Sequence, residues 1–131
     1  MNKYEADKLF RKASQLEEAG NPEDALAIRK QLAGEFPNSK LLILTLAKSL
    51  QNLGNLIEAE KYFKRAVKVA PKWELASLQL FHFYFDNKGT RWQIDRTDEA
   101  FDEMHRFQSI SHCEDYVKIV REINEKHAEN G

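Results

Sequence analysis

The residues that could carry out catalytic or metal chemistry are few, and their spacing does not bring them together. The chain contains four histidines and a single cysteine. His112 and Cys113 are adjacent, so their side chains diverge on a helix, whereas zinc ligands must converge, often as pairs two to four residues apart on a turn. Nothing in the sequence orients His112 as the base of a nucleophile pair. We therefore predict neither a metal site nor a catalytic cysteine.

Neighbouring acids are the remaining candidates for acid–base chemistry. Each pair lies in or near the first turn of an expected helix, where a carboxylate complements the positive end of the helix dipole. These pairs are Asp98–Glu99, Asp102–Glu103 and Glu114–Asp115. The sequence also lacks a glycine-rich phosphate loop, an HExxH motif and a nucleophile elbow. We expect the chain not to be an enzyme and to need no cofactor.

A basic stripe is the next candidate, because cations spaced along one helix face can contact phosphates. Lys61, Lys64, Arg65 and Lys68, followed by Lys72, lie on one side of an expected helix. Aromatic residues for base stacking are not interleaved on this stripe. The formal net charge of −1, from 20 basic and 21 acidic residues, also argues against capture of nucleic acid or an anionic membrane. A solvated helix face is the favoured interpretation, and RNA binding is a remote alternative.

An insertion near residues 87–97 carries residue types that dominate protein interfaces. It contains Arg91, Trp92 and Arg96. Tryptophan supplies a large apolar area and arginine supplies bidentate hydrogen bonds, so both are enriched among residues that carry binding energy. Two interpretations stay open: this loop contacts a partner protein, or Trp92 inserts into the core and pins the loop.

These candidates must be positioned by helices. The chain has 131 residues, of which 42% are hydrophobic, as expected of one folded domain. Leu, Ala, Glu and Lys dominate and β-branched residues are scarce, so we predict an all-α fold. Apolar residues spaced by three and four, together with the prolines, predict seven helices. They cover about residues 3–19, 22–36, 39–53, 56–70, 73–87, 97–110 and 113–128.

A period of 34 residues relates these helices. Gly20–Asn21 recurs as Gly54–Asn55, and Pro37 recurs as Pro71. Further matches at this spacing are Ala25 with Ala59, and Leu16 with Leu50 and Tyr84. A helix–turn–helix unit of this length is typical of a repeat protein.

The pattern resembles the tetratricopeptide repeat. The second repeat carries the resemblance best, through Ile43, Leu46, Ala47, Leu50, Ala59, Phe63 and Pro71. The first repeat matches at Leu9, Ala13, Leu16, Ala25 and Pro37, but has Lys12 and Arg29 where the family usually has apolar residues. The third repeat matches at Leu80, Tyr84 and Ala100. There Phe81 replaces a small residue, and we expect it to splay the helix pair.

The resemblance implies a right-handed solenoid in a single domain, residues 1–131. Its three helix pairs cover about residues 3–38, 39–72 and 73–111, and a capping helix covers about 113–128. The first helix of each pair would line the concave face, where an apolar patch usually marks a binding site. The residues projected onto this face are Phe10, Ser14, Glu17, Leu41, Leu44, Lys48, Gln51, Leu75, Leu78, His82 and Phe85. The alternative is that the capping helix or the insertion fills the groove, or that some of these residues are core.

The same resemblance argues against one known type of partner. Tetratricopeptide co-chaperones hold the carboxylate end of a chaperone tail with lysine, asparagine and arginine side chains. The matching positions here are Phe10, Ser14, Thr45, Leu75 and Gln79. Since these side chains form no cationic clamp, we reject binding of chaperone tails.

The resemblance therefore predicts a protein–protein interaction module, in which Lys48, His82 and Glu17 set the orientation of the partner. The most specific hypothesis, by analogy with small free-standing members, is a dedicated binder that sequesters or neutralises one cognate protein, such as a bacterial toxin or effector. The alternative is a general adaptor that binds short peptides in a larger complex. Self-association through the groove is a further alternative.

The expected location is the cytoplasm. The apolar runs are far shorter than the roughly 18 to 20 residues that a membrane span needs. The amino terminus lacks the apolar stretch of a secretory signal. The lone cysteine excludes an internal disulfide, which favours a reducing compartment.

Overall fold

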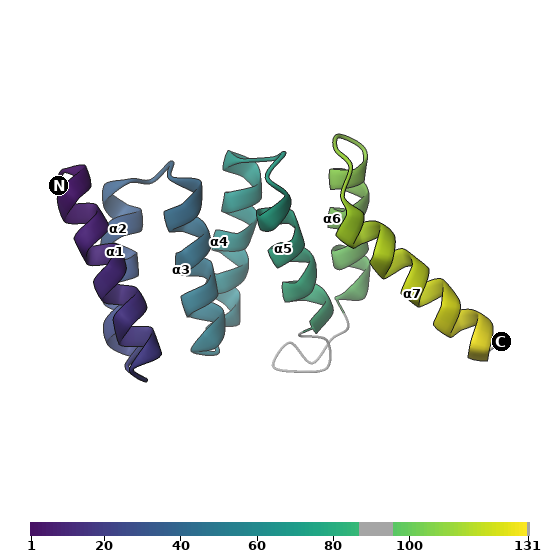
Figure 1. The fold of residues 1–131 in the computed structure, drawn as a ribbon, viewed down its shortest axis with the longest axis horizontal. Coiled ribbons are helices and arrows are strands. Elements are labelled where there is room, and N and C mark those ends of the chain that lie inside the picture. Colours follow the sequence, from purple (N-terminus) through teal and green to yellow (C-terminus); the bar gives the residue numbers. More distant parts are fainter. Residues whose placement is uncertain (87–95, 131) are drawn as a thin grey trace. The chain divides into compact units, whose positions relative to one another are not determined.

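A computed structural model of the chain describes residues 1–86 and 96–130, with side chains described as far as residue 126. Within these ranges every regular element is a helix (Figure 1). The helices are α1 (Lys3–Glu18), α2 (Pro22–Glu35), α3 (Lys40–Asn52), α4 (Leu56–Val69), α5 (Glu74–Asp86), α6 (Thr97–Gln108) and α7 (Glu114–Asn130). Each of these bounds lies within two residues of its prediction, so the all-α prediction is confirmed.

The chain divides into two compact units, Met1–Pro71 and Lys72–Gly131. The first unit contains α1 to α4, which are the first two predicted repeats. In it α1 packs on α2, α2 on α3, and α3 on α4. The second unit contains α5 to α7, with α5 packed on α6. Among the described residues, none of the helices has the length and apolarity that crossing a membrane would require.

The two predicted glycine turns of the first unit adopt the same conformation. Gly20 has a φ of 84° and Gly54 a φ of 79°, in the left-handed region that favours glycine. The amide of each following asparagine donates to the carbonyl five residues earlier, at 2.8 Å for Asn21 and 2.9 Å for Asn55. This bond closes the carboxyl end of the first helix in each pair, as in a Schellman motif.

In the first unit, proline follows the second helix of each pair. Phe36, with φ −127° and ψ 71°, and Ala70, with φ −132° and ψ 72°, have left the helical region. Each directly precedes a proline, whose ring disfavours helical geometry in the residue before it. Turns of two kinds therefore alternate in the first unit, and both follow from residues placed 34 apart.

Small residues let the helices of the first unit approach closely. Ala13, Ala25, Ala47 and Ala59 are all 0% exposed. Phe63 on α4, also 0% exposed, adds a large aromatic side chain to the core of this unit. The core of this unit is thus close-packed along the repeat pattern.

The second unit replaces the small residue by Phe81, which is 1% exposed. Its ring lies 5.8 Å from that of Phe101 on α6 and 5.5 Å from that of Tyr116 on α7, both edge to face. The bulky side chain therefore joins the three helices of this unit in one aromatic cluster. The splaying expected at Phe81 stays a prediction.

Candidate protein-binding surface

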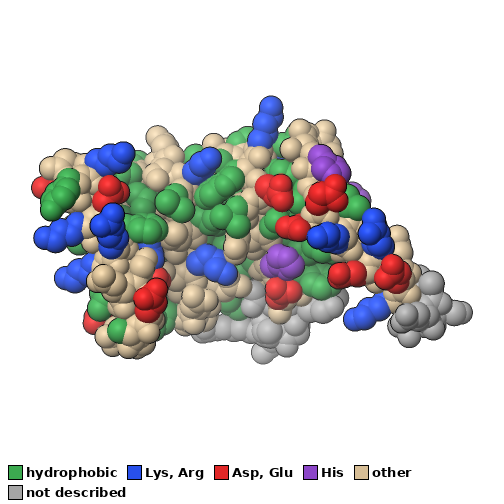
Figure 2. All heavy atoms as spheres, in the orientation of Figure 1, with side chains coloured by type: hydrophobic (Ala, Val, Ile, Leu, Met, Phe, Trp, Pro, Cys, Tyr) green, Lys and Arg blue, Asp and Glu red, His purple; other side chains and the backbone are tan. Residues whose placement is uncertain are grey.

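In the first unit, seven of the predicted contact residues lie on α1 and α3. Leu41 is 48% exposed, and Lys48 is also exposed. Phe10, Ser14, Glu17 and Gln51 are half-buried. Figure 2 shows hydrophobic side chains beside basic side chains over α3. These residues form a mixed apolar and charged surface.

Leu44 lies in the core, which corrects its predicted place on the surface. It is only 3% exposed. Because α3 packs against both α2 and α4, more of its circumference is covered than that of a helix with one neighbour. Leu44 is therefore buried, although it lies on the face of α3 that was predicted to be exposed.

Three of the predicted surface residues hold a buried cation. Arg29 on α2 is 5% exposed, and its Nη2 donates to Glu17 Oε1 at 2.6 Å and to Ser14 Oγ at 3.2 Å. Its Nε donates to Glu17 Oε2 at 3.4 Å. The guanidinium carbon lies 4.8 Å from the centre of the Phe10 ring. Pairing, hydrogen bonds and the ring together compensate for removing this charge from water.

The same carboxylate connects α1 to α3. Ser49 Oγ, on α3, donates to Glu17 Oε2 at 2.6 Å. Partial burial acts to raise the pKa of Glu17, but hydrogen bonds from Arg29 and Ser49 outweigh it, so the pKa lies below its usual value. Among the described residues, Nη1 of Arg29 is the buried side-chain nitrogen or oxygen without a hydrogen-bond partner.

In the second unit, four predicted contact residues lie on α5. Leu75 is 45% exposed and the His82 side chain 51% exposed, whereas Leu78 and Phe85 are half-buried. His82 Nδ1 lies 3.4 Å from Asp86 Oδ2. Phe85 stacks on Phe81 with ring centres 5.4 Å apart, so it contributes partly to the aromatic cluster.

The predicted loop contacts fall mostly outside the described residues. Arg91 and Trp92 lie in that part of the chain, and both interpretations of the loop stay predictions. The side chain of Arg96 is only 11% exposed. Both its Nε and Nη2 donate to Glu99, and its guanidinium carbon lies 4.9 Å from the centre of the Tyr84 ring. Arg96 thus joins α5 to α6.

A second buried polar cluster, which the sequence did not indicate, holds α7 in the second unit. Ser77 Oγ donates to Glu103 Oε2 at 2.6 Å and lies 2.7 Å from the Tyr116 hydroxyl. Arg106 donates to both oxygens of Glu103, at 2.7 and 2.6 Å. Burial raises the pKa of Tyr116 well above its usual value, so the hydroxyl keeps its proton.

Cys113 and His112, though adjacent in sequence, lie in different environments. Cys113 is 1% exposed, and burial raises the pKa of its thiol, which disfavours the reactive thiolate. His112 is exposed, and its Nε2 lies 2.7 Å from Glu114 Oε1. In the described parts of the chain, no three His, Cys, Asp or Glu side chains gather as metal ligands would.

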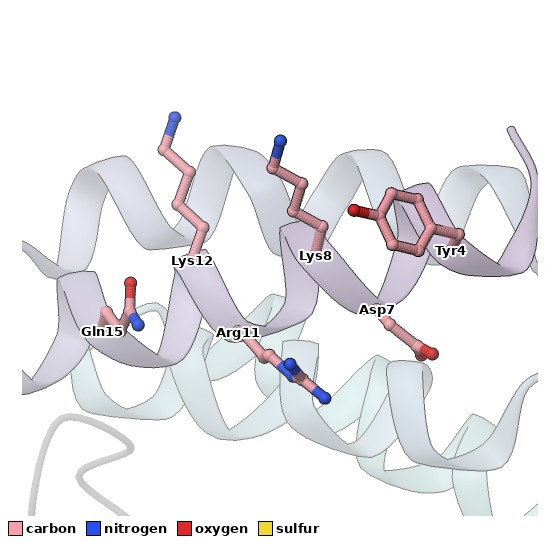
Figure 3. A pocket seen from close by; sticks show the side chains of 6 residues that line it. All are labelled: Tyr4, Asp7, Lys8, Arg11, Lys12 and Gln15. Carbon is pink, nitrogen blue, oxygen red and sulfur yellow. The ribbon is translucent and has the colours of Figure 1, made fainter.

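A shallow hollow on α1 offers no converging chemistry. It is lined by Tyr4, Asp7, Lys8, Arg11, Lys12 and Gln15, all from this one helix. Figure 3 shows that Lys8 and Lys12 point to one side of the helix and Arg11 to the other. Tyr4 is 76% exposed. Since these groups do not face a common point, they do not form a small-molecule site.

Comparison with protein families matches residues 16–80 to the tetratricopeptide repeat. The matched stretch includes α2, α3 and α4 in full. The fold is of the tetratricopeptide type. The resemblance drawn from the 34-residue period is confirmed at the level of the fold, and the narrower toxin-binding class stays a prediction.

Two solved structures are similar in fold. "MamA 41-end from Desulfovibrio magneticus RS-1" has a TM-score of 0.64 and 22% identity, over 79% of this chain and 55% of that one. The "MamA RS-1 ArsTM double mutant" has a TM-score of 0.65 and 22% identity, over 81% and 56%. This chain spans about half the length of these structures. A search of curated proteins found no match.

Arg29 stands at a tetratricopeptide position that is usually apolar. The residue 34 positions later is Phe63, which is 0% exposed in the same unit. The sequence marked Arg29 as a departure, but did not indicate that Glu17 and Ser14 hold it. The sequence signal for this pairing was the presence of an acid and two serines on the helices that face Arg29.

Proposed function

We propose that this chain is a protein–protein interaction module with two equivalent contact surfaces for apolar groups of a partner, one on α3 in the first unit and one on α5 in the second. The observation that carries the proposal is a pair of equivalent leucines. Leu41 and Leu75 are 34 residues apart, each is the second residue of its helix, and they are 48% and 45% exposed. A single exposed leucine needs no explanation. Recurrence at the repeat period favours a shared use of both.

Each leucine is accompanied by a basic residue on the same helix face. Lys48 follows Leu41 by seven residues, and His82 follows Leu75 by seven. Residues seven apart lie on one side of a helix, two turns from each other. Both basic side chains are exposed. Each helix therefore offers a partner the same pair of contacts: a leucine for an apolar side chain, and a basic residue for an acid or carbonyl oxygen.

The proposed mechanism is binding alone, without catalysis. Covering a half-exposed leucine contributes up to about 1 kcal/mol, so each leucine is a modest anchor for a partner. The basic residues fix the register of the partner more than they add affinity. We propose the cytoplasm as the compartment, which the buried free thiol of Cys113 supports.

The test is an affinity capture from the source lysate with a Leu41→Glu, Leu75→Glu double variant. The matched control is Ile57→Glu, Ile110→Glu, because these residues are 79% and 46% exposed, lie one in each unit, and give the same change of charge. A protein enriched with wild type and control but lost with the α3–α5 variant supports the proposal. Equal capture by all three overturns it.

The captured protein also decides between the two narrower functions. One protein bound in a fixed ratio supports a dedicated binder of a cognate toxin or effector. Several proteins that share a short segment support a general adaptor. Leu41 is the better probe than Leu44, because a charge at Leu44 would enter the core.

A further inference from the structure

A second surface of the first unit has a different chemistry. A hollow over α4 is lined by Asn38, Lys61, Lys64, Arg65, Lys68 and Val69. Four of these six residues are basic and none is acidic. The hollow therefore gathers Lys61, Lys64, Arg65 and Lys68 of the basic stripe, which the sequence favoured as a solvated face.

The hollow is partly preorganised. Arg65 Nη2 donates to the backbone carbonyl of Pro37 at 2.9 Å, which fixes the guanidinium against the turn between α2 and α3. Asn38, the next residue of that turn, lines the same hollow. A cation already held in place loses less conformational entropy when a ligand binds.

An apolar side chain lies among these cations. Val69, the last residue of α4, is 38% exposed and lines the hollow. Lys64 is partly neutralised by Glu60 Oε2 at 3.4 Å. Lys61 and Lys68 are exposed. The site thus offers positive charge beside a small apolar patch.

We infer that this hollow binds an acidic protein segment that carries one apolar side chain. The carboxylates would meet Lys61, Lys68 and Arg65, and the apolar side chain would cover Val69. Charge complementarity supplies the attraction, and the apolar contact supplies the selectivity. The inference is independent of the surface proposed on α3 and α5.

A nucleic acid fits this hollow less well. None of the six lining residues is aromatic, and the ring of the neighbouring Tyr62 is half-buried with the Lys61 ammonium 5.6 Å from its centre, so the lining offers bases no stacking platform. Glu60 lies beside Lys64 and would repel a continuous phosphate backbone. A phosphate backbone also has no apolar group with which to cover Val69.

The test uses the full chain and fluorescence anisotropy with three labelled probes. The first probe is a glutamate-rich peptide of about 15 residues with a central leucine, and the second has serine in place of the leucine. The third is a single-stranded RNA of equal charge. We expect the leucine peptide to bind about fivefold more tightly than the serine peptide, and the RNA to bind most weakly.

Variants assign the binding to the hollow. Lys61→Glu, Lys68→Glu should weaken the leucine peptide about tenfold or more. The matched control Lys3→Glu, Lys30→Glu changes the net charge equally at exposed sites outside the hollow, and should weaken it about twofold or less. Val69→Ser should abolish the preference for leucine while the dependence on charge remains. Leu41→Glu, Leu75→Glu, which adds negative charge outside the hollow, should also weaken peptide binding by about twofold or less.

Three outcomes would overturn the inference. One is RNA binding as tight as that of the leucine peptide and equally sensitive to the α4 variant. Another is an equal loss with the α4 variant and its control, since the attraction would then come from net charge alone. The third is equal affinity for the leucine and serine peptides. Circular dichroism of each variant checks that the helices are intact.

Discussion

Both units contain a buried cluster of serine, glutamate and arginine. In the first unit the arginine is the more buried member of the ion pair, and in the second unit it is the glutamate. In the first unit Arg29 is 5% exposed and the Glu17 side chain 30% exposed. In the second unit Glu103 is 7% exposed and the Arg106 side chain 34% exposed. In each cluster a serine hydroxyl lies 2.6 Å from the carboxylate, and two guanidinium nitrogens donate to that carboxylate.

The two buried groups, a guanidinium and a carboxylate, differ in the number of hydrogen bonds that they need. A guanidinium has five donors and keeps its charge, whereas a carboxylate can accept a proton. Glu103 accepts from Ser77 and twice from Arg106. Arg29 keeps Nη1 without a partner even with Glu17 and Ser14 in place. The first cluster therefore depends more strongly on its one carboxylate than the second does.

The largest expected effect is the loss of stability when the carboxylate of either cluster is removed. Glu17→Ala leaves Arg29 buried and charged, which should lower the free energy of unfolding by about 3 kcal/mol in urea denaturation. Glu103→Ala should cost about 1 to 2 kcal/mol, because the exposed part of Arg106 can be solvated. A larger loss for Glu103→Ala would contradict the comparison.

A double variant serves as the control for the first cluster. Adding Arg29→Leu to Glu17→Ala removes the stranded charge and restores the apolar residue that the repeat position usually has. Most of the lost stability should return. If the double variant is as unstable as Glu17→Ala, the loss came from packing of Glu17 and not from Arg29.

A smaller effect sharpens the role of the second cluster. Tyr116→Phe keeps the ring against Phe81 but removes the hydroxyl that meets Ser77, at a cost of about 1 kcal/mol. Hydrogen exchange should accelerate in α7 and remain unchanged in α1. Tyr4→Phe, at a residue 76% exposed, is the matched control and should change neither. Equal acceleration in both helices would show that the hydroxyl does not act locally on α7.

The sequence predicted those parts of the fold whose causes are local. Helix bounds and turns follow from apolar spacing and from residues such as Gly20 and Pro37, which act on their own neighbourhood. The 34-residue period then placed the exposed leucines, Leu41 and Leu75, on equivalent positions. Leu44 was misplaced because its burial depends on the number of helices packed around α3.

The partners within the two polar clusters were not predicted, because these residues are distant in sequence. Glu17 and Arg29 are 12 residues apart, and Ser77 and Tyr116 are 39 apart. Such pairs meet only when the facing helices have a fixed register. Arg29 was visible as an exception to the repeat pattern, which identified the position but not its partners.

The smallest expected effect is on the pH dependence of stability. The cluster in the first unit should lose stability as the pH falls, and the cluster in the second unit as the pH rises. Glu17 has a lowered pKa in the folded chain, so its stabilisation is present above the ordinary glutamate pKa of 4.5 and is lost as the pH falls through the folded pKa. The stability difference between wild type and Glu17→Gln should therefore shrink on acidification. A difference that stays constant down to the acid transition would contradict the lowered pKa.

Tyr116 acts in the opposite direction, because burial raises its pKa in the folded chain. Above the ordinary tyrosine pKa of 10.0 the unfolded chain loses this proton while the folded chain keeps it, so stability falls as the pH rises. Compared with wild type, Tyr116→Phe should lose less of its neutral-pH stability as the pH rises above 10.0. Its loss of stability at acid pH should match that of wild type. Glu17→Gln should make stability less sensitive to acid and leave the alkaline unfolding midpoint unchanged. Base sensitivity therefore belongs to the cluster that holds α7, and acid sensitivity to the one that holds Arg29.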